Sequence, residues 1–459
     1  MKITQRLAEF VANRPPDAIA QLTREHARRA ILDTLGVMLA GTREDASSIV
    51  AQITREQGGA EEATVLGYGF RAPAGEAALI NGMSGHALDF DDVSMSMRGH
   101  PSVPLLPAVL ALGEKLGSSG RDVMDAFVLG FEVECKLGRL IGGPHYALGW
   151  HATSTFGTVG AAVACARLLR LDAARTQTAL AIAASLASGV RQNFGSMTKP
   201  LHAGWAARNG VLAATLAECG LTADAEALEG ESGFLRAASG GSEFDPSPLG
   251  RLGDPWEIVS PGVGVKLYPC CYATHRAIDA ALALRPAIER DLAGIESVRV
   301  SVSPGTPMPL RTTLPNSGLE GKFSMEYCIA TALHDGHVTL ASFSDNAVAR
   351  PHARSLMSKV TMIEDGPAAN FPIQGTARVS VQFRDREPAH SPLIEVPRGD
   401  PQNPLSWDEL RAKFRDCTAT IIDPDGIEAA IRSVEEIDSA HDIHEVTRVI
   451  APAGLVVRG

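Results

Sequence analysis

Four segments of the chain carry ionisable and polar side chains inside otherwise apolar sequence. They cover residues 85–102, 144–155, 193–204 and 265–275, and they contain histidine, lysine, tyrosine, cysteine and aspartate. Chemistry at a carbon next to a carboxylate needs a base that removes a proton, an acid that returns one, and cations that neutralise the carboxylate and the developing enolate. These side chains supply all three kinds of group. The sequence therefore predicts proton transfer on a small anionic substrate.

Three carboxylates fall within four residues, at Asp89, Asp91 and Asp92. Such a cluster could bind Mg²⁺, could cap a helix and pair with Arg98, or could supply an active-site carboxylate. The sequence has no obvious second acidic cluster, and it contains no glycine-rich phosphate loop, His-Glu-x-x-His or Gly-x-Ser-x-Gly. We therefore expect an enzyme that uses side chains alone, without a metal ion or a cofactor.

His151 stands between Trp150 and a run of small and hydroxylated residues that is typical of a helix start. A helix N-terminus offers N–H groups and positive potential to an anion, so we expect His151 to act in catalysis. Tyr146 lies five residues earlier and is expected to share the same cleft. Lys199 lies in an otherwise uncharged stretch, and Pro200 after it favours an extended backbone. We therefore expect this lysine to project from a loop.

The first 260 residues have the apolar spacing and the composition that are typical of packed helices. Apolar residues recur at near-helical spacing in 19–39, 104–116 and 122–140, two Ala-rich stretches lie within 157–187, and a third begins near His202. Aromatic residues make up only 5% of the chain, while Ala and Gly are abundant. Because small residues let helices approach closely, we expect a core of tightly packed Ala-rich helices.

The pattern of apolar residues changes near Pro261. Apolar residues alternate in 297–302 and in 377–383, which predicts two half-buried strands. Two helical stretches and one hairpin lie in the same part of the chain, at 277–285, 325–334 and 384–396. This mixture predicts a separate α+β domain.

A Pro/Gly/Asp-rich linker at 397–404 precedes a helical C-terminus. Ser406 and Glu409 have the spacing of a capping box at the start of the next helix. We expect the C-terminal helices to pack back on the first domain. The predicted fold is therefore mainly α, with a large all-helical domain of residues 1–261 and 398–459 and a smaller α+β lid domain of residues 262–397.

The chain has 459 residues, a formal net charge of -11 and a pI of about 5.7. Phosphate binding needs a basic surface, so nucleic acid is not expected as a partner, although a few cations in a cleft can attract a small anion. The run 178–190 is too short and too polar to span a bilayer, and the N-terminus has no apolar signal core. Seven scattered cysteines are typical of reduced thiols. We expect a cytoplasmic protein that does not bind membranes.

Three motifs, in this order along the chain, resemble those of the MmgE/PrpD family: Asp89-Phe90-Asp91-Asp92, His100-Pro101-Ser102 and Thr198-Lys199-Pro200-Leu201-His202. The resemblance covers nearly the whole chain. It implies a helical domain built from both chain ends, an α+β lid, a homodimer, and a site in the cleft between the domains. The family includes dehydratases, decarboxylases and epimerases of small carboxylates.

The motif match carries the family's site residues to six positions, Asp89, His100, His151, Lys199, Lys266 and Tyr327. With the residues singled out above, we expect five catalytic and four substrate-binding side chains. The catalytic set is Asp89, His100, Tyr146, His151 and Lys199. The substrate-binding set is Arg98, Lys266, Cys271 and Tyr327.

Two departures from the family pattern bear on the reaction. The decarboxylase branch has Thr after its Asp cluster, where this chain has Val93, and a second-domain His where this chain has Cys271. Both disfavour decarboxylation. The dehydratase branch typically has Asp-Asn after its His-Pro-Ser, where Val and Pro follow here, and the strings 97–102 and 145–151 look more like the epimerase. We predict a cofactor-independent lyase of the dehydratase type acting on a small di- or tricarboxylate, with an epimerase or a non-catalytic carboxylate-binding relative as alternatives.

Overall fold

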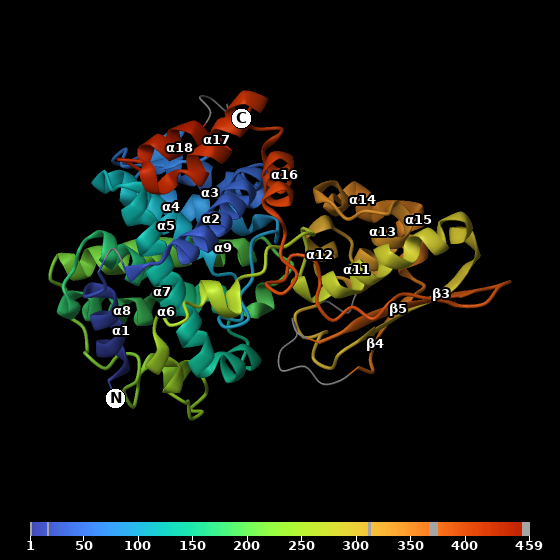
Figure 1. The fold of residues 1–459 in the computed structure, drawn as a ribbon, viewed down its shortest axis with the longest axis horizontal. Coiled ribbons are helices and arrows are strands. Elements are labelled where there is room, and N and C mark those ends of the chain that lie inside the picture. Colours follow the sequence, from blue (N-terminus) through green and yellow to red (C-terminus); the bar gives the residue numbers. More distant parts are fainter. Residues whose placement is uncertain (1, 16–17, 311–313, 367–374, 452–459) are drawn as a thin grey trace.

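The computed structural model describes residues 2–15, 18–310, 314–366 and 375–451. Figure 1 shows a larger body made almost wholly of helices and a smaller body in which helices cover a sheet, joined at a narrow waist. Each body has its own hydrophobic core. The first core draws its residues from 3–265 and 405–450, and the second draws on 268–383 together with Phe194. The expected fold class, mainly α with a smaller α+β part, is confirmed.

The larger body contains α1 to α10 and α16 to α18. The bounds are α1 Ile3–Ala12, α2 Gln21–Gly41, α3 Asp45–Gln57, α4 Ala74–Ala87, α5 Ser102–Leu116, α6 Gly120–Ala147, α7 Ala152–Leu168, α8 Ala173–Leu186, α9 Thr198–Glu218, α10 Phe234–Ala238, α16 Trp407–Thr418, α17 Pro424–Glu435 and α18 His444–Ile450. The helical stretches expected in the first 260 residues are confirmed. Within the described ranges, no helix combines the length and the apolar character needed to cross a membrane.

Helices α4 and α9 pack against each other with their backbones nearly in contact. A Cβ on Gly204 would lie 2.2 Å from the carbonyl oxygen of Leu79, and one on Gly82 would lie 2.9 Å from the Cα of Gly204. Any larger side chain would push the two helices apart, so the expectation of close packing through small residues is confirmed. This crossing brings the first turn of α9, with Lys199, beside the end of α4, which leads to Asp89.

The C-terminal helices pack on the N-terminal ones, as expected. Helix α16 lies against α2, and the buried Nζ of Lys413 lies 2.6 Å from Oδ1 of Asp33. Lys413 also donates to the backbone oxygen of Phe90 at 2.9 Å. Ser406 and Glu409 form the capping box that begins α16. The end of the chain therefore supports the Asp-rich loop from behind.

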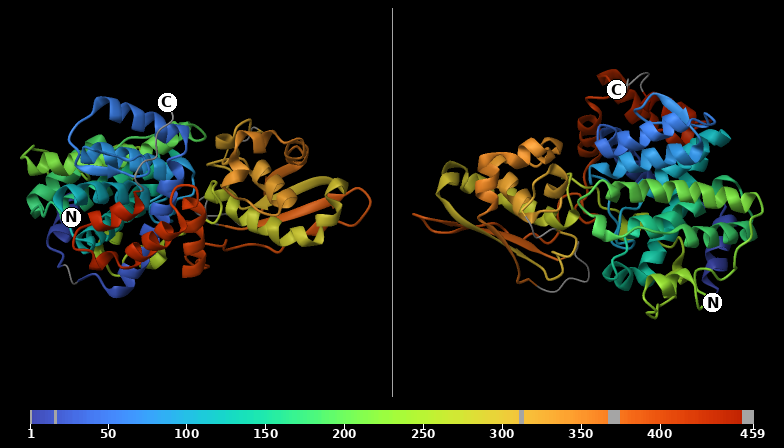
Figure 2. Two further views of the ribbon diagram at one scale, coloured as in Figure 1. Left: turned by 90° about the horizontal axis from the view of Figure 1, so that it is seen from above. Right: turned by 180° about the vertical axis from the view of Figure 1, so that it is seen from behind.

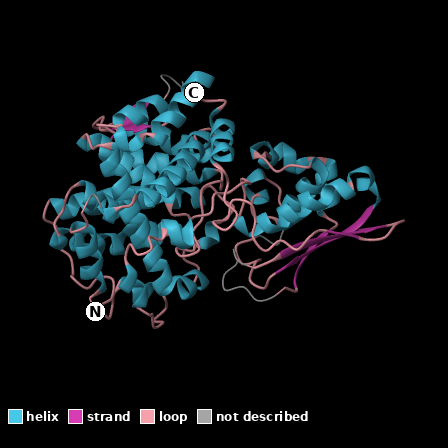
Figure 3. Ribbon diagram, viewed as in Figure 1, coloured by secondary structure: helices cyan, strands magenta, loops and turns pink. Residues whose placement is uncertain are grey.

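The smaller body is built on a four-stranded sheet with the order β4-β3-β5-β6, in which only β3 and β4 are parallel. The bounds are β3 Ile295–Val302, β4 Val360–Glu364, β5 Ala377–Phe383, β6 Ala389–His390, α11 His275–Leu284, α12 Gly318–Gly321, α13 Met325–Asp335, α14 Asp345–Ala349 and α15 Pro351–Met357. Figure 3 shows the helices on one face of this sheet. The two expected strands, the hairpin and both helices are confirmed. Strand β4 and a short hairpin in the larger body, β1 Ala63–Val65 with β2 Phe70–Ala72, were not expected.

Two stretches of chain cross the waist side by side, and Figure 2 shows this waist from two further directions. The N–H of Val265 donates to the oxygen of Gly399 at 2.8 Å. Gly399 has φ +90°, and a Cβ there would lie 2.0 Å from the oxygen of Val265, so only glycine fits. Val93 and Gly264 exchange two backbone hydrogen bonds of 2.8 Å. The crossing therefore fixes Lys266 next to the Asp-rich loop.

Candidate active site

A small cavity lies at the waist, with a wall that both bodies build. Its volume is about 50 Å³, which is enough for a few water molecules. Eight of the nine side chains expected from the sequence line it: Asp89, Arg98, His100, Tyr146, His151, Lys199, Lys266 and Cys271. The wall is completed by Val93, Gly99, Phe194, Tyr272, Pro309 and Phe323. The fold therefore gathers residues from all four segments around one cavity.

Asp89 is the central carboxylate of this cavity. It follows α4 with φ +51°, a left-handed conformation that non-glycine residues seldom adopt outside turns and functional sites. The Nζ atoms of Lys199 and Lys266 lie 2.5 Å and 3.1 Å from its Oδ1. Burial by itself would raise the pKa of Asp89, but the two ammonium groups outweigh it and hold that pKa well below its usual range. Asp89 is therefore an ionised carboxylate that orients two cations.

Asp91 holds two imidazole rings behind Asp89. Its Oδ2 lies 2.8 Å from Nδ1 of His86 and 3.2 Å from Nδ1 of His100. The same nitrogen of His100 lies 2.8 Å from the backbone oxygen of Asp92. Because both partners of that nitrogen are acceptors, Nδ1 of His100 carries a proton, and Nε2 remains free to accept one when the ring is neutral. That Nε2 faces Asp89, with 3.9 Å between it and Oδ1.

His151 is the N-cap of α7, which confirms the helix start expected at this position. Its Nδ1 lies 2.9 Å from Nδ1 of His202, and its ring stacks on His86 and meets the ring of Phe194 edge-on. Burial, followed by the nearby histidines and lysine, lowers the pKa of His151 well below its usual value. Burial and Lys199 lower the pKa of His202 to about 4. His151 is therefore a neutral imidazole near pH 7, the form that a general base requires.

Lys199 lies in a helix and not in the loop that we expected. It is the second residue of α9, and that prediction of its backbone was wrong. A proline such as Pro200 is accepted in the first turn of a helix because its missing N–H would have no acceptor there. The Nζ of Lys199 lies 5.4 Å from the ring centroid of Phe194 and 5.3 Å from that of Phe323. One aromatic ring from each body therefore covers this lysine.

The remaining expected residues occupy different environments. Burial raises the pKa of Tyr146, which keeps its hydroxyl protonated, and burial raises the pKa of Cys271 to about 12, which keeps its thiol neutral. Arg98 lines the same cavity with φ +60°. Tyr327 is not among the lining residues, because its ring packs in the second core and its hydroxyl donates to the backbone oxygen of Ser342. We therefore leave Tyr327 out of the candidate site.

The three carboxylates of the Asp cluster have different roles. Asp92 accepts hydrogen bonds from the N–H and the hydroxyl of Ser102 at the start of α5, so it caps that helix. Burial raises the pKa of Asp92 to about 8. The sequence left several roles open for this cluster. In the structure Asp92 caps a helix, whereas Asp89 and Asp91 pair with cationic side chains and imidazoles.

A metal ion would fit this cluster poorly. Four side chains place potential ligand atoms within 4.8 Å of one another: His86, Asp89, Asp91 and His100. However, Asp89 already contacts two ammonium groups, which would repel a divalent cation at the same carboxylate. A second such group lies on the smaller body, at His334, Asp335 and His352. There too the carboxylate already has a cation, because Arg350 contacts Asp335 at 2.6 Å.

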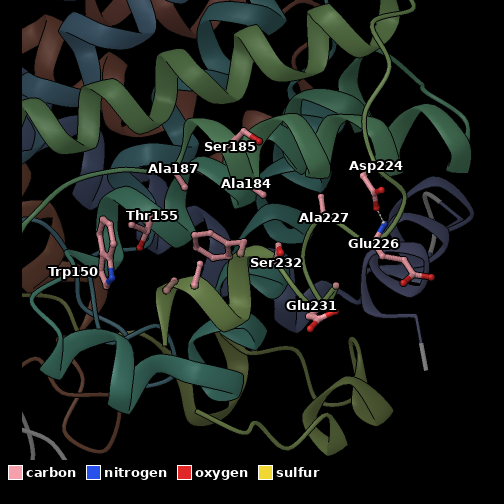
Figure 4. Close-up of a pocket in the computed structure, with 15 residues that line it drawn as sticks. Trp150, Thr155, Ala184, Ser185, Ala187, Asp224, Glu226, Ala227, Glu231 and Ser232 are labelled. Atoms are coloured by element: carbon pink, nitrogen blue, oxygen red, sulfur yellow. Dashed lines mark hydrogen bonds between the residues drawn. The ribbon is translucent and has the colours of Figure 1, made fainter. Parts of the chain in front are cut away.

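A larger pocket of about 680 Å³ lies between the start of α7 and residues 224–238. Figure 4 shows Trp150 and Thr155 at one end and Asp224, Glu226 and Glu231 toward the other. Among the described residues that line it, there is no lysine, arginine or histidine. Such a lining repels an anion. The cavity at the waist, with its lysines, is therefore the better candidate for a site that binds carboxylates.

Several members of the site were not assigned a role from the sequence. His86 and His202 lie inside segments that were singled out, but only the structure shows that they pair with Asp91 and His151. Phe323 comes from the smaller body, and no sequence motif marked it. A search for aromatic residues beside buried lysines could have found it only after the fold was known.

Two family models match the chain, the MmgE/PrpD N-terminal domain over residues 5–247 and the MmgE/PrpD C-terminal domain over residues 268–444. The chain belongs to the MmgE/PrpD family. It is similar to cis-aconitate decarboxylase of Mus musculus, with 32% identity over 443 residues that cover 92% of this chain and 88% of the relative. The human cis-aconitate decarboxylase is 31% identical over 450 residues, 93% of this chain and 90% of that protein. Cis-aconitate decarboxylase of Aspergillus terreus is 28% identical over 462 residues, 95% and 92% of the two chains.

Proposed function

We propose that this chain is a lyase that forms or protonates a carbanion next to a carboxylate of a small di- or tricarboxylate by acid–base chemistry. The observation that carries the proposal is the convergence of a neutral imidazole, His151, with the Lys199 and Lys266 ammonium groups on one buried cavity. Two lysines around one aspartate leave a surplus of positive charge, which favours an anionic ligand. The names of the relatives, cis-aconitate decarboxylases, agree with this substrate class.

His151 is the proposed base. Burial, and after it the neighbouring histidines and Lys199, disfavour the imidazolium form of this residue. A bound polycarboxylate brings two or three negative charges, which raise the pKa of a nearby imidazole. The substrate itself would therefore increase the basicity of His151 at the moment when a proton has to be taken up. This coupling would keep the base neutral until substrate is present.

Lys199 and Lys266 are the proposed electrostatic groups. Asp89 fixes both ammonium groups before the reaction, so they need little reorganisation when charge develops on an enolate. Tyr146 is the proposed proton donor, and His100 is a second proposed proton-transfer residue that can donate from Nε2 only after it has accepted a proton there. The raised pKa of Tyr146 keeps its hydroxyl protonated, and Asp91 orients the ring of His100.

Three reactions could pass through the same carbanion intermediate. Loss of CO₂ would form it directly, and this outcome is favoured by the names of the relatives. Loss of water would follow proton removal, and it is favoured by Val93 and Cys271, which depart from the decarboxylase pattern and both line the cavity. Epimerisation is the second candidate function. It is favoured by the presence of a protonated thiol, Cys271, in the same cavity as an imidazole, because a second donor could protonate the opposite face.

The test is incubation of the protein with a panel of di- and tricarboxylates in D₂O, followed by NMR and gas analysis. New alkene signals indicate dehydration, evolved CO₂ with deuterium in the product indicates decarboxylation, and deuterium at carbon without net loss indicates epimerisation. The absence of turnover and of exchange across the whole panel would overturn the proposal and favour a carboxylate-binding protein.

We also propose that residues 262–397 act as a lid on a domain formed by residues 1–261 and 398–459. A volume of about 50 Å³ is small beside the roughly 300–1,000 Å³ of most small-molecule sites, and separation of the two parts would make room for a substrate. Lys322 of the lid donates to the backbone oxygen of Leu88 at 2.7 Å, a contact that opening would break. The family resemblance further favours a homodimer, which light scattering of the purified protein would test.

A further inference from the structure

A second hollow adjoins the cavity at the waist. It has a volume of about 370 Å³ and is lined by residues of 148–149, 190–194 and 308–310. We name it the vestibule. Phe194 and Pro309 line both the vestibule and the cavity, so these two side chains form the partition between them. A ligand in the vestibule is therefore one side chain away from the candidate site.

Arg191 gives the vestibule its charge. Among the lining residues that the structure describes, it is the only one with a charged side chain. Its guanidinium carbon lies 4.0 Å from the ring centroid of Tyr146, which lines the cavity on the other side. The backbone N–H of Arg191 donates to the oxygen of Gly149 at 2.8 Å, which anchors the residue. Arg191 thus stands between the two hollows.

The Arg191 side chain hydrogen-bonds Tyr146, but one of its donors has no acceptor among the described residues. Its Nε is buried and has no hydrogen-bond partner among them. A buried donor without an acceptor is unfavourable, and an anion would supply the missing acceptor. Arginine presents its N–H groups in a planar fork that matches a carboxylate.

Size gives a second and independent argument. The cavity alone, about 50 Å³, does not hold a molecule with several carboxylates, whereas the vestibule adds about 370 Å³ beside it. A substrate with carboxylates at both ends could place one end near Lys199 and Lys266 and the other end at Arg191. The overall charge of -11 makes such local cations the features that attract an anion to this face.

We propose that Arg191 binds a distal carboxylate of the substrate in the vestibule and so selects for molecules that carry carboxylates at both ends. This inference rests on the proposed function, because it assigns the far end of the same substrate. Arg191 is a specificity residue in this arrangement and takes no part in proton transfer. A purely structural Arg191, which only supports the ring of Tyr146, is the competing explanation.

The test is calorimetric binding of tricarballylate, a saturated tricarboxylate, and of butyrate, a monocarboxylate, to the full chain. Arg191→Met should weaken tricarballylate binding by about 10- to 150-fold, the range for a charge-assisted hydrogen bond, and should change butyrate binding less than about threefold. Arg191→Lys keeps the charge without the fork and should fall between the two. Arg415→Met removes the same charge from the exposed side of α16 and should leave both affinities unchanged.

Three outcomes would overturn the inference. Equal weakening of both ligands by Arg191→Met would mean that Arg191 only supports the site through Tyr146. Unchanged tricarballylate affinity in Arg191→Met, with normal turnover of a polycarboxylate, would refute the vestibule while leaving the proposed function intact. A native protein that neither binds tricarballylate nor turns over any polycarboxylate would overturn the inference together with the proposed function.

Discussion

The Nδ1 atoms of His151 and His202 lie 2.9 Å apart, so one of these two nitrogens donates its proton to the other. When His151 is the donor, its Nε2 carries no proton and can remove one from a substrate. When His151 is the acceptor, its Nε2 carries a proton and can deliver one. The tautomer of His202 therefore decides whether the same imidazole acts as a base or as an acid.

Replacement of His151 should remove proton transfer without unfolding the protein. We expect His151→Gln to lower kcat by about 10²–10⁴, the usual contribution of a general acid or base. His337→Gln, a change of the same type at an exposed position, is the control and should keep full activity. Steady-state kinetics on the best substrate of the panel checks this, and an unchanged kcat would remove His151 from the mechanism.

The pair with His202 should matter for turnover more than for binding. Loss of one buried hydrogen-bond partner costs about 1–3 kcal/mol, so His202→Leu should lower kcat by about 5- to 150-fold while KM changes little. His202→Asn offers an amide at the position of Nδ1 and should recover part of the loss. A rise in KM alone, or the same kcat in both variants, would contradict a positioning role.

Lys199 and Lys266 should act together on substrate carboxylates. Lys266→Met should weaken binding of a polycarboxylate by about one to two decades, and the effect should shrink with a monocarboxylate. Thermal unfolding must accompany the measurement, because Lys266 is fully buried and donates to the backbone oxygen of Asp89 at 2.8 Å. Lys115→Met at the exposed end of α5 is the control for charge. The same loss for both ligands would show that Lys266 is only structural.

The buried carboxyl of Asp92 should make stability fall as pH rises. Its pKa is raised to about 8 in the folded protein, while the unfolded chain has the ordinary value of about 3.9. Between these values the folded state binds the extra proton, so the free energy of unfolding decreases with increasing pH by up to about 1.4 kcal/mol per pH unit. The contribution is present at pH 4 and is lost by about pH 8.

Denaturant unfolding of Asp92→Asn and the native protein at pH 5 and pH 7 measures this contribution. The variant does not titrate at this position, so its stability relative to the native protein should be higher at pH 7 than at pH 5. Asp408→Asn changes a carboxylate whose side chain is 91% exposed and should show no such trend. A difference between Asp92→Asn and the native protein that is independent of pH would refute an elevated pKa.

Metal chelation should leave activity intact. The four side chains that could surround an ion include Asp89, which already contacts Lys199 and Lys266. We expect the same kcat before and after exhaustive dialysis against EDTA. Loss of activity that Mg²⁺ or another divalent ion restores would establish a metal site at the Asp cluster.

Much of the fold could be predicted because local patterns and tertiary packing agree. The alternation in 377–383 became β5 because one face of that strand is buried beneath helices, and the spacing of Ser406 and Glu409 gave the start of α16. Strand β4 was not predicted because burial does not alternate along Val360–Glu364. The backbone of Lys199 was predicted wrongly because the rule for residues before proline yields to helix packing in a first turn.

The residues that form the candidate site could be predicted better than the contacts between them. Motif positions placed most of its residues on one cavity, yet the contacts join residues that are far apart in sequence, 110 positions for Lys199 with Asp89 and 51 for His151 with His202. Such contacts have no local signal. The roles of His86 and Phe323 could not be predicted for the same reason, because they depend on how the helices and the two bodies pack together.

The ion pair between Asp33 and Lys413 has a consequence for how the protein is made. The nascent chain presents Asp33 and α2 early, but α16, the helix that covers them, is synthesised much later. A span of 323 positions separates Phe90 from its partner Lys413, which corresponds to roughly 15–65 s of translation at about 5–20 residues per second. The face of α2 that α16 covers is therefore exposed during this interval, so the packing of the two helices and their buried ion pair form only after it.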